Sequence, residues 1–169
     1  IGVVPEAWHA NWTALQLGTT GFVGSFQAGT TDLTALGSNT WSDGTYKYIE
    51  TAQAAIYKQQ NGIHIFDVAA SGTADAAISW TTALTIDNAG KVGIGTDTPQ
   101  DTLHVVTDSA TTNDTVDVVT IEATSSGTPA IGFGPTIEFK AERGASSADS
   151  VGRLGFVADG MTGTTVNGA

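Results

Sequence analysis

The chain has 169 residues and a net charge of −11, because 17 Asp and Glu residues outnumber six Lys and Arg. So few basic residues argue against a nucleic-acid partner, whose phosphates are bound by clustered Lys and Arg. Cysteine is absent, which excludes disulfides, thiolate metal sites and thiol redox chemistry. No apolar run approaches the ~20 residues that cross a bilayer, so we expect no membrane insertion.

The composition favours short β-strands joined by tight turns. Hydrophobic residues make up 40% of the chain, but much of this fraction is Ala. Thr, Gly, Val and Asn are also prominent, and these residues are typical of short strands and turns. One copy of such a chain buries little aliphatic surface to offset the entropy that it loses on folding. We therefore expect an obligate oligomer in which apolar surface is buried between copies.

Along the first part of the chain, the side chains alternate with the period of a β-strand. Trp8 and Trp12 allow one short helical turn near residues 5–12, before the alternation begins. Residues 28–44 are rich in Gly, Thr, Asn and Ser, which is typical of a loop. The alternation predicts strands at residues 13–17, 21–27, 45–51, 54–60, 63–69, 78–86, 91–95 and 102–107.

Two connections between these strands have hairpin sequences. Asn61-Gly62 is the strongest two-residue hairpin signal in the chain. The run from Asp87 to Gly90 places Gly where a turn needs a positive φ. Both connections are therefore predicted to join antiparallel strands.

The second part of the chain follows a polar spacer at residues 108–115. Strands are predicted at residues 116–123, 130–142 and 151–158, and residues 152–158 echo residues 62–69. We therefore divide the chain into a first β-rich module at 1–107, the spacer at 108–115, and a second, incomplete module at 116–169. No long helix is predicted anywhere, and the fold class is all-β.

Nothing in the sequence marks a catalytic or cofactor site. Residues 90–96 are rich in Gly, but acidic residues and Pro99 follow them where a phosphate loop needs a helix. The three His residues are scattered, with no metal-ligand spacing. A Gly-x-Ser-x-Gly nucleophile elbow is also absent. We therefore expect no enzyme activity, no cofactor and no metal.

The aromatic residues allow two roles. Exposed Trp and Tyr rings stack on sugars, and Trp41, Tyr46 and Tyr48 are the candidates for such glycan contacts. A chain this poor in Leu also needs aromatic rings for its core, and we expect burial to be their main role.

One element resembles a known family. Residues 84–99 end in Gly-Lys-Val-Gly-Ile-Gly-Thr-Asp-Thr-Pro, and Leu103-His104-Val105 follows. This resembles the Gly-x-Val-Gly-Ile-Gly-Thr-x-x-Pro … Leu-His-Val element of bacteriophage tail-fibre and tailspike-like proteins. Residues 41–49, 62–66, 71–74 and 135–139 are similar to the same proteins, so that the resemblance extends over residues 8–156.

The resemblance implies a homotrimer in the virion, at the tail fibre, with a role in host attachment. Its partners would be other copies of itself, other tail or fibre proteins and a bacterial surface receptor, such as a glycan. The expected fold is an elongated, intertwined trimeric fibre of short antiparallel strands and hairpins. Three alternatives remain open: a glycan-binding module of the fibre, a tailspike depolymerase, and a bacterial surface adhesin.

A subunit interface is predicted at the Gly-rich element. Val92 and Ile94 alternate with Gly93 and Gly95, so one face of this strand carries branched side chains and the other face carries none. The branched face needs an apolar partner, which the flanking polar residues do not supply. We therefore predict that Val92 and Ile94, with Leu84 and Ile86, meet the equivalent residues of two other chains around a three-fold axis.

Overall fold

The structure, a computed structural model, describes residues 8–142, 148–157 and 165–166. Within these ranges the chain is all-β, as predicted, and contains no helix. It divides into two compact units, Ile1–Val118 and Val119–Ala169. The predicted spacer, residues 108–115, lies shortly before this division.

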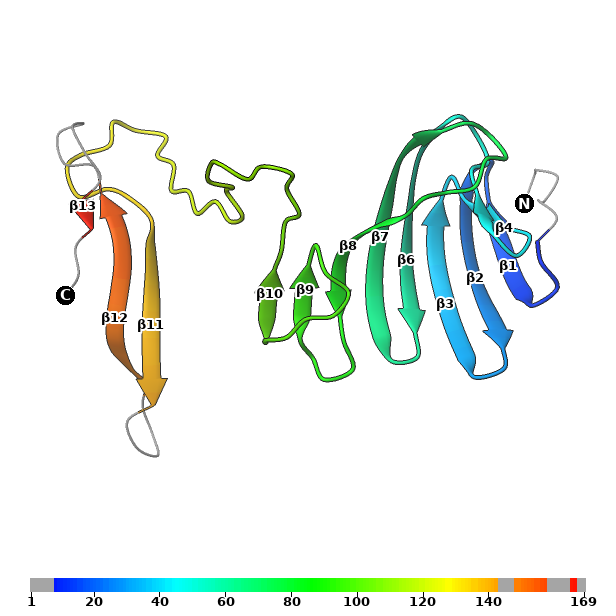
Figure 1. Ribbon diagram of the computed structural model, residues 1–169, viewed down its shortest axis with the longest axis horizontal. Coiled ribbons are helices and arrows are strands. Elements are labelled where there is room, and N and C mark those ends of the chain that lie inside the picture. The colour runs from blue at the N-terminus through cyan, green and yellow to red at the C-terminus, as the bar shows by residue number, and fades with distance from the viewer. Residues whose placement is uncertain (1–7, 143–147, 158–164, 167–169) are drawn as a thin grey trace. The chain divides into compact units, whose positions relative to one another are not determined.

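The first unit is built on an eight-stranded sheet with the order β1-β2-β3-β6-β7-β8-β9-β10, visible in Figure 1. All neighbouring strands run antiparallel except β9 and β10, which run parallel. The strands of the sheet are β1 (Trp12–Leu17), β2 (Gly21–Ala28), β3 (Thr31–Ser38), β6 (Ala52–Gln60), β7 (Ile63–Gly72), β8 (Thr81–Ile86), β9 (Val92–Ile94) and β10 (Leu103–Val105).

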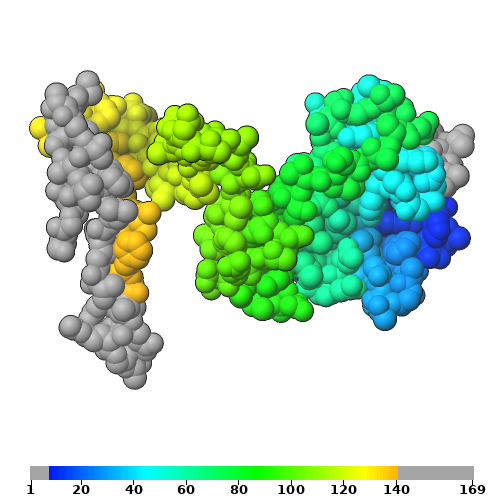
Figure 2. Space-filling model, viewed as in Figure 1, coloured from blue at the N-terminus to red at the C-terminus, as the bar shows by residue number. Residues whose placement is uncertain are grey.

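A short second layer covers one face of this sheet, which we call the inner face. It comprises a two-stranded hairpin of β4 (Trp41–Ser42) and β5 (Tyr46–Lys47), together with residues 76–78. Ile78 donates its backbone N–H to the Tyr46 carbonyl at 2.8 Å, and Lys47 and Ala77 form an isolated antiparallel bridge. In Figure 2 the cyan surface that includes the hairpin adjoins the green surface of later parts of the first unit. The predicted helical turn near residues 5–12 is not formed at residues 8–12, where the chain makes a single reverse turn closed by a hydrogen bond from the Trp12 N–H to the His9 carbonyl at 2.9 Å. Residues 5–7 lie outside the described ranges.

The core lies between the inner face and this layer. Phe22, Leu33, Ala35 and Ile56 are buried at its centre. The Phe22 ring lies directly on Gly37 of β3, where a Cβ atom would collide with it. The missing side chain at Gly37 leaves room for the Phe22 ring to lie against the backbone of β3. Further aromatic rings surround this centre, from Trp8, Trp12, Phe26, Tyr46 and Trp80.

The prediction of a loop at residues 28–44 is wrong. Most of this segment is β3, a central strand that pairs with both β2 and β6. Leu33, Ala35 and Gly37 face the core, and the residues between them face outward. The Gly, Thr and Ser content suggested a loop, but the period-two alternation and the pairing at both edges determine the structure.

Asn39 ends β3 in a buried turn with a φ of 55°. Its side-chain Nδ2 donates to the carbonyls of Glu50 and Gln53, both at 3.0 Å, and its Oδ1 accepts the Glu50 N–H at 2.7 Å. Asn is among the few residues that tolerate this left-handed conformation. One side chain thus joins the end of β3 to the start of β6.

Asn39→Ala should lower the free energy of unfolding by about 2–4 kcal/mol, because three buried hydrogen bonds are lost. Asn39→Gly loses the same bonds but relieves the strain at positive φ, so it should cost about 1 kcal/mol less. Urea denaturation of both variants measures the difference. Asn88→Ala, in an exposed turn, is the control and should stay within about 0.5 kcal/mol of the parent.

Both predicted hairpins are confirmed. Asn61 and Gly62 have φ angles of 51° and 81° and join antiparallel β6 and β7. Gly90, with a φ of 80°, lies in the turn between antiparallel β8 and β9. The Asp87 carboxylate holds this second turn by accepting the backbone N–H groups of Ala89 and Lys91 at 2.9 and 2.8 Å.

The Gly-rich element forms the unusually short link between parallel β9 and β10. A parallel connection ordinarily takes a dozen residues or more, yet here only residues 95–102 make it. This loop folds over the inner face of β9, where a Cβ atom on Gly93 would lie 2.5 Å from the Thr96 carbonyl oxygen. The missing side chain at Gly93 therefore permits the close approach of backbone from the same chain.

The second unit contains a small antiparallel group of β11 (Thr136–Glu142), β12 (Ala148–Val157) and β13 (Thr165–Val166). The strand predicted at residues 116–123 is absent, and the one predicted at 130–142 begins only at Thr136. Val116, Val119 and Ile121 favour strands by propensity but remain exposed and unpaired. Propensity alone does not form a strand without a neighbour to complete its hydrogen bonds.

Candidate interaction surface

The face of the eight-stranded sheet opposite the core, which we call the outer face, carries one continuous line of apolar side chains. Residues paired directly across neighbouring strands place their side chains on the same face. The register aligns one apolar residue from every strand in turn. This apolar row consists of Leu15, Val23, Leu36, Tyr57, Phe66, Leu84, Ile94 and Val105.

Much of the apolar row is open to solvent in a single chain. Leu36 is 53% exposed, and Phe66 and Ile94 are each 42% exposed. The Tyr57 and Phe66 rings stack at 4.6 Å. Leu17 and Val68 extend the apolar surface on one side of the row. A row of large apolar side chains that crosses eight strands is far more than the scattered exposed residues of an ordinary monomer surface.

The outer face is also uncharged, although the chain is strongly acidic. Apart from Asp32 at a hairpin end, its outward positions carry apolar side chains, Ser, Thr, Gln and His64. The inner face, by contrast, holds an ion pair between Lys58 and Asp67 at 2.6 Å, with Asp67 only 3% exposed. Thr82 also donates to the Asp67 carboxylate, at 2.8 Å. Charge is thus kept away from the apolar row.

The structure brings the four predicted interface residues together on this outer face. Leu84 pairs with Ile94, and Ile86 pairs with Val92. Ile94 is exposed, and the other three are half-buried. Their contact with a second chain stays a prediction. The rest of the row, on β1, β2, β3, β6, β7 and β10, was not predicted from the sequence, because it depends on the register between strands.

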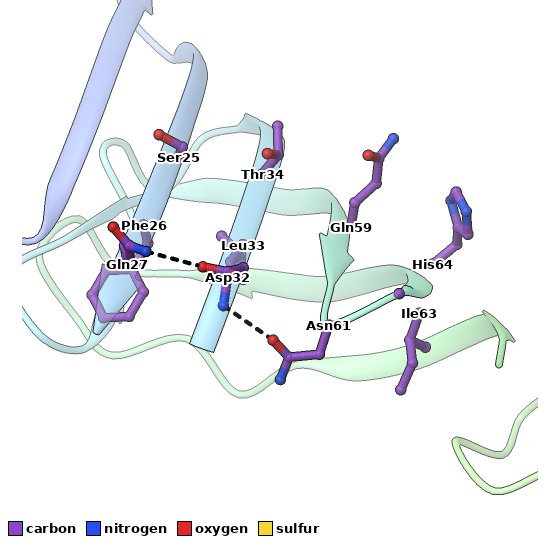
Figure 3. Close-up of a pocket in the computed structure, with 11 residues that line it drawn as sticks. Ser25, Phe26, Gln27, Asp32, Leu33, Thr34, Gln59, Asn61, Ile63 and His64 are labelled. Atoms are coloured by element: carbon purple, nitrogen blue, oxygen red, sulfur yellow. Dashed lines mark hydrogen bonds between the residues drawn. The ribbon is translucent and has the colours of Figure 1, made fainter. Parts of the chain in front are cut away.

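A polar border runs beside the apolar row, toward the ends of the hairpins. Ser25, Thr34, Gln59 and His64 point to the same side in Figure 3 and line an open groove of about 650 Å³. The Tyr57 hydroxyl lies 2.6 Å from His64 Nδ1 and joins the border to the row. The Gln59 side-chain amide also donates to the Tyr57 hydroxyl, at 3.0 Å. The border side chains are exposed and flank the row as the polar rim flanks a protein interface.

Asn61 fixes the two hairpin ends beside this groove. Its Oδ1 accepts the Asp32 N–H at 3.0 Å, and its own N–H donates to the Asp32 carbonyl at 3.1 Å. The Asp32 carboxylate in turn accepts the Gln27 side-chain amide at 3.3 Å. The β2–β3 and β6–β7 hairpins are therefore held to each other at this end of the outer face.

The candidate glycan contacts lie on the other side of the sheet. Trp41 is 9% exposed and Tyr48 is 5% exposed, and the Tyr48 hydroxyl donates to the Ala70 carbonyl at 2.6 Å. Tyr46 packs edge-on against Trp12 and Trp80. Burial, aided by the charge of Asp67, raises the pKa of Tyr46. Buried rings offer no open face to a sugar, which argues against Trp41 and Tyr48 as glycan contacts. Their burial agrees with the main role predicted for the aromatic residues, whereas Tyr57 lies on the outer face.

In the described ranges, no three His, Asp or Glu side chains gather closely enough to hold a metal ion. The same ranges contain no helix with the length and apolar character needed to cross a membrane. A scan against protein-family models, a search of curated proteins and a search of solved structures found no match to this chain.

Proposed function

We propose that the chain is a structural segment of a bacteriophage tail fibre, in which three copies assemble through their outer faces. The observation that carries this proposal is the exposed, uncharged apolar row that crosses all eight strands of the sheet. With strands ~4.8 Å apart, such a row is about 34 Å long. A surface of this length left in water would be a liability, and burial against a partner removes it.

The absence of charge favours another copy of the chain as the partner. Each copy carries a net charge of −11, so an acidic interface would repel itself. An uncharged apolar face avoids this repulsion and suits a closed symmetric assembly. In a trimer, the apolar rows of three chains meet near the axis and form a second core, in addition to the core inside each chain.

The role that follows is mechanical. The trimer forms part of a fibre shaft in the virion, joined to other tail or fibre proteins, and holds the receptor-binding end at the bacterial surface. It needs no catalytic group and no cofactor. The sequence likeness of residues 84–105 to tail-fibre proteins and the stiff, hydrogen-bonded sheet both support this role.

Immunogold electron microscopy tests the proposed location. An antibody raised against the chain should label the tail fibres of purified phage particles. Labelling of the bacterial envelope in cells that carry no phage genes, with unlabelled particles, would instead identify a bacterial adhesin and contradict the proposal.

A further inference from the structure

An aromatic pocket lies on the inner face, between the sheet and the β4–β5 hairpin. Its floor is a line of paired residues across four strands: Trp12, Phe26, Leu33 and Gln60. Its roof comprises His9, Ser42, Gly44 and Tyr46, and its volume is about 380 Å³.

The walls of this pocket are fixed by contacts between rings. The Trp12 ring lies 5.4 Å from that of Phe26 and 6.0 Å from that of Tyr46. The His9 ring lies 6.4 Å from Phe26. The backbone of His9 donates to the Ser42 carbonyl at 2.7 Å, which ties the roof together. The pocket is therefore preformed, as ligand sites usually are.

Several polar groups around the pocket have unused hydrogen-bonding capacity. Within the described ranges, neither the Gln60 amide nor the hydroxyls of Thr31 and Tyr46 make a hydrogen bond. His9 Nδ1 accepts the Asn11 N–H at 3.3 Å, which leaves Nε2–H as a donor. Among the described residues, no Asp, Glu, Lys or Arg lines the pocket.

We propose that this pocket binds one neutral pyranose ring. The missing charges disfavour phosphate, carboxylate and cationic ligands, which need an opposite charge. A sugar ring combines an apolar C–H face for the aromatic residues with hydroxyls for Gln60, Thr31 and Tyr46. The volume lies within the range of small-molecule sites. The pocket is on the opposite face from the apolar row, so a sugar can bind while the outer face is occupied.

Saturation-transfer-difference NMR on the full chain, with D-glucose, D-galactose and N-acetyl-D-glucosamine as probes, tests this site. At least one sugar should show saturable binding, and Gln60→Ala should weaken it roughly five-fold through the loss of one neutral hydrogen bond. Gln59→Ala is the matched control: Gln59 is the preceding residue of β6 and faces the outer groove, so its loss should leave the affinity unchanged.

The charge of the ligand is tested with D-glucuronic acid, in which a carboxylate replaces the C6 hydroxymethyl group of glucose. It should not displace the neutral sugar that binds. No saturable binding by any of the three neutral sugars would overturn the proposal. So would equal affinities of Gln60→Ala and the parent, or a loss confined to Gln59→Ala, which would place the sugar in the outer groove. None of these results bears on assembly through the outer face.

Discussion

Ile94→Asp is expected to abolish assembly and leave single chains in solution. Ile94 is paired with Leu84 and Val105 in the apolar row and is 42% exposed in one chain. In the trimer, three copies of the new carboxylate would converge near the axis, away from water. Burying unpaired charges costs several kcal/mol for each group, and the three carboxylates would also repel one another.

Ile94→Ala should weaken the assembly without abolishing it, at about 2–4 kcal/mol for each buried copy. Ile131→Asp is the control, since Ile131 is 82% exposed and lies outside any strand. It makes the same chemical change and should assemble like the parent. Sedimentation velocity compares the three variants, and an Ile94→Asp variant with the parent's sedimentation coefficient would show that Ile94 faces solvent.

Gly95→Ala is expected to disrupt the β9–β10 link and to cost at least about 3 kcal/mol of stability. Gly95 has a φ of 73°, which strains any residue with a Cβ. The added Cβ would also collide with the carbonyl oxygen of Val106. Relief requires movement of the backbone that holds two hydrogen bonds, Gly95 N–H to Ala83 at 3.2 Å and Val106 N–H to Ile94 at 2.9 Å.

Gly90→Ala separates the effect of the positive φ from the effect of the collision with Val106. Gly90 has nearly the same φ, 80°, but open space where its Cβ would be. It should therefore cost only the conformational strain, about 1 kcal/mol. Thermal unfolding followed by circular dichroism compares the variants. Equal melting temperatures would mean that the collision at Val106 is relieved without cost and would contradict this account of the link.

Local features of the sequence predicted the all-β class and both hairpins. Asn61-Gly62 and Gly90 need positive φ angles that few residues adopt, so their turns could be located without knowledge of the rest of the fold. β3 was not predicted, because its Thr, Gly and Ser residues are typical of a loop. Only its pairing with both β2 and β6 makes it a central strand.

The candidate surface was predicted in part. The alternation of Val92 and Ile94 with Gly was enough to indicate one apolar face at β8 and β9. The continuation through Leu36 and Phe66 could not be predicted, because a shift of one residue in any strand pairing would turn its side chains to the other face. The error at residues 116–123 has the opposite origin: their composition favours a strand, but no neighbouring strand pairs with them.

The mass of the assembled protein tests the central claim most directly. Each chain has a mass of 17.2 kDa. Multi-angle light scattering during size-exclusion chromatography should give three times this mass, with no change on dilution across the micromolar range, because the apolar rows are buried between chains. A folded, stable species of 17.2 kDa would contradict assembly through the outer face.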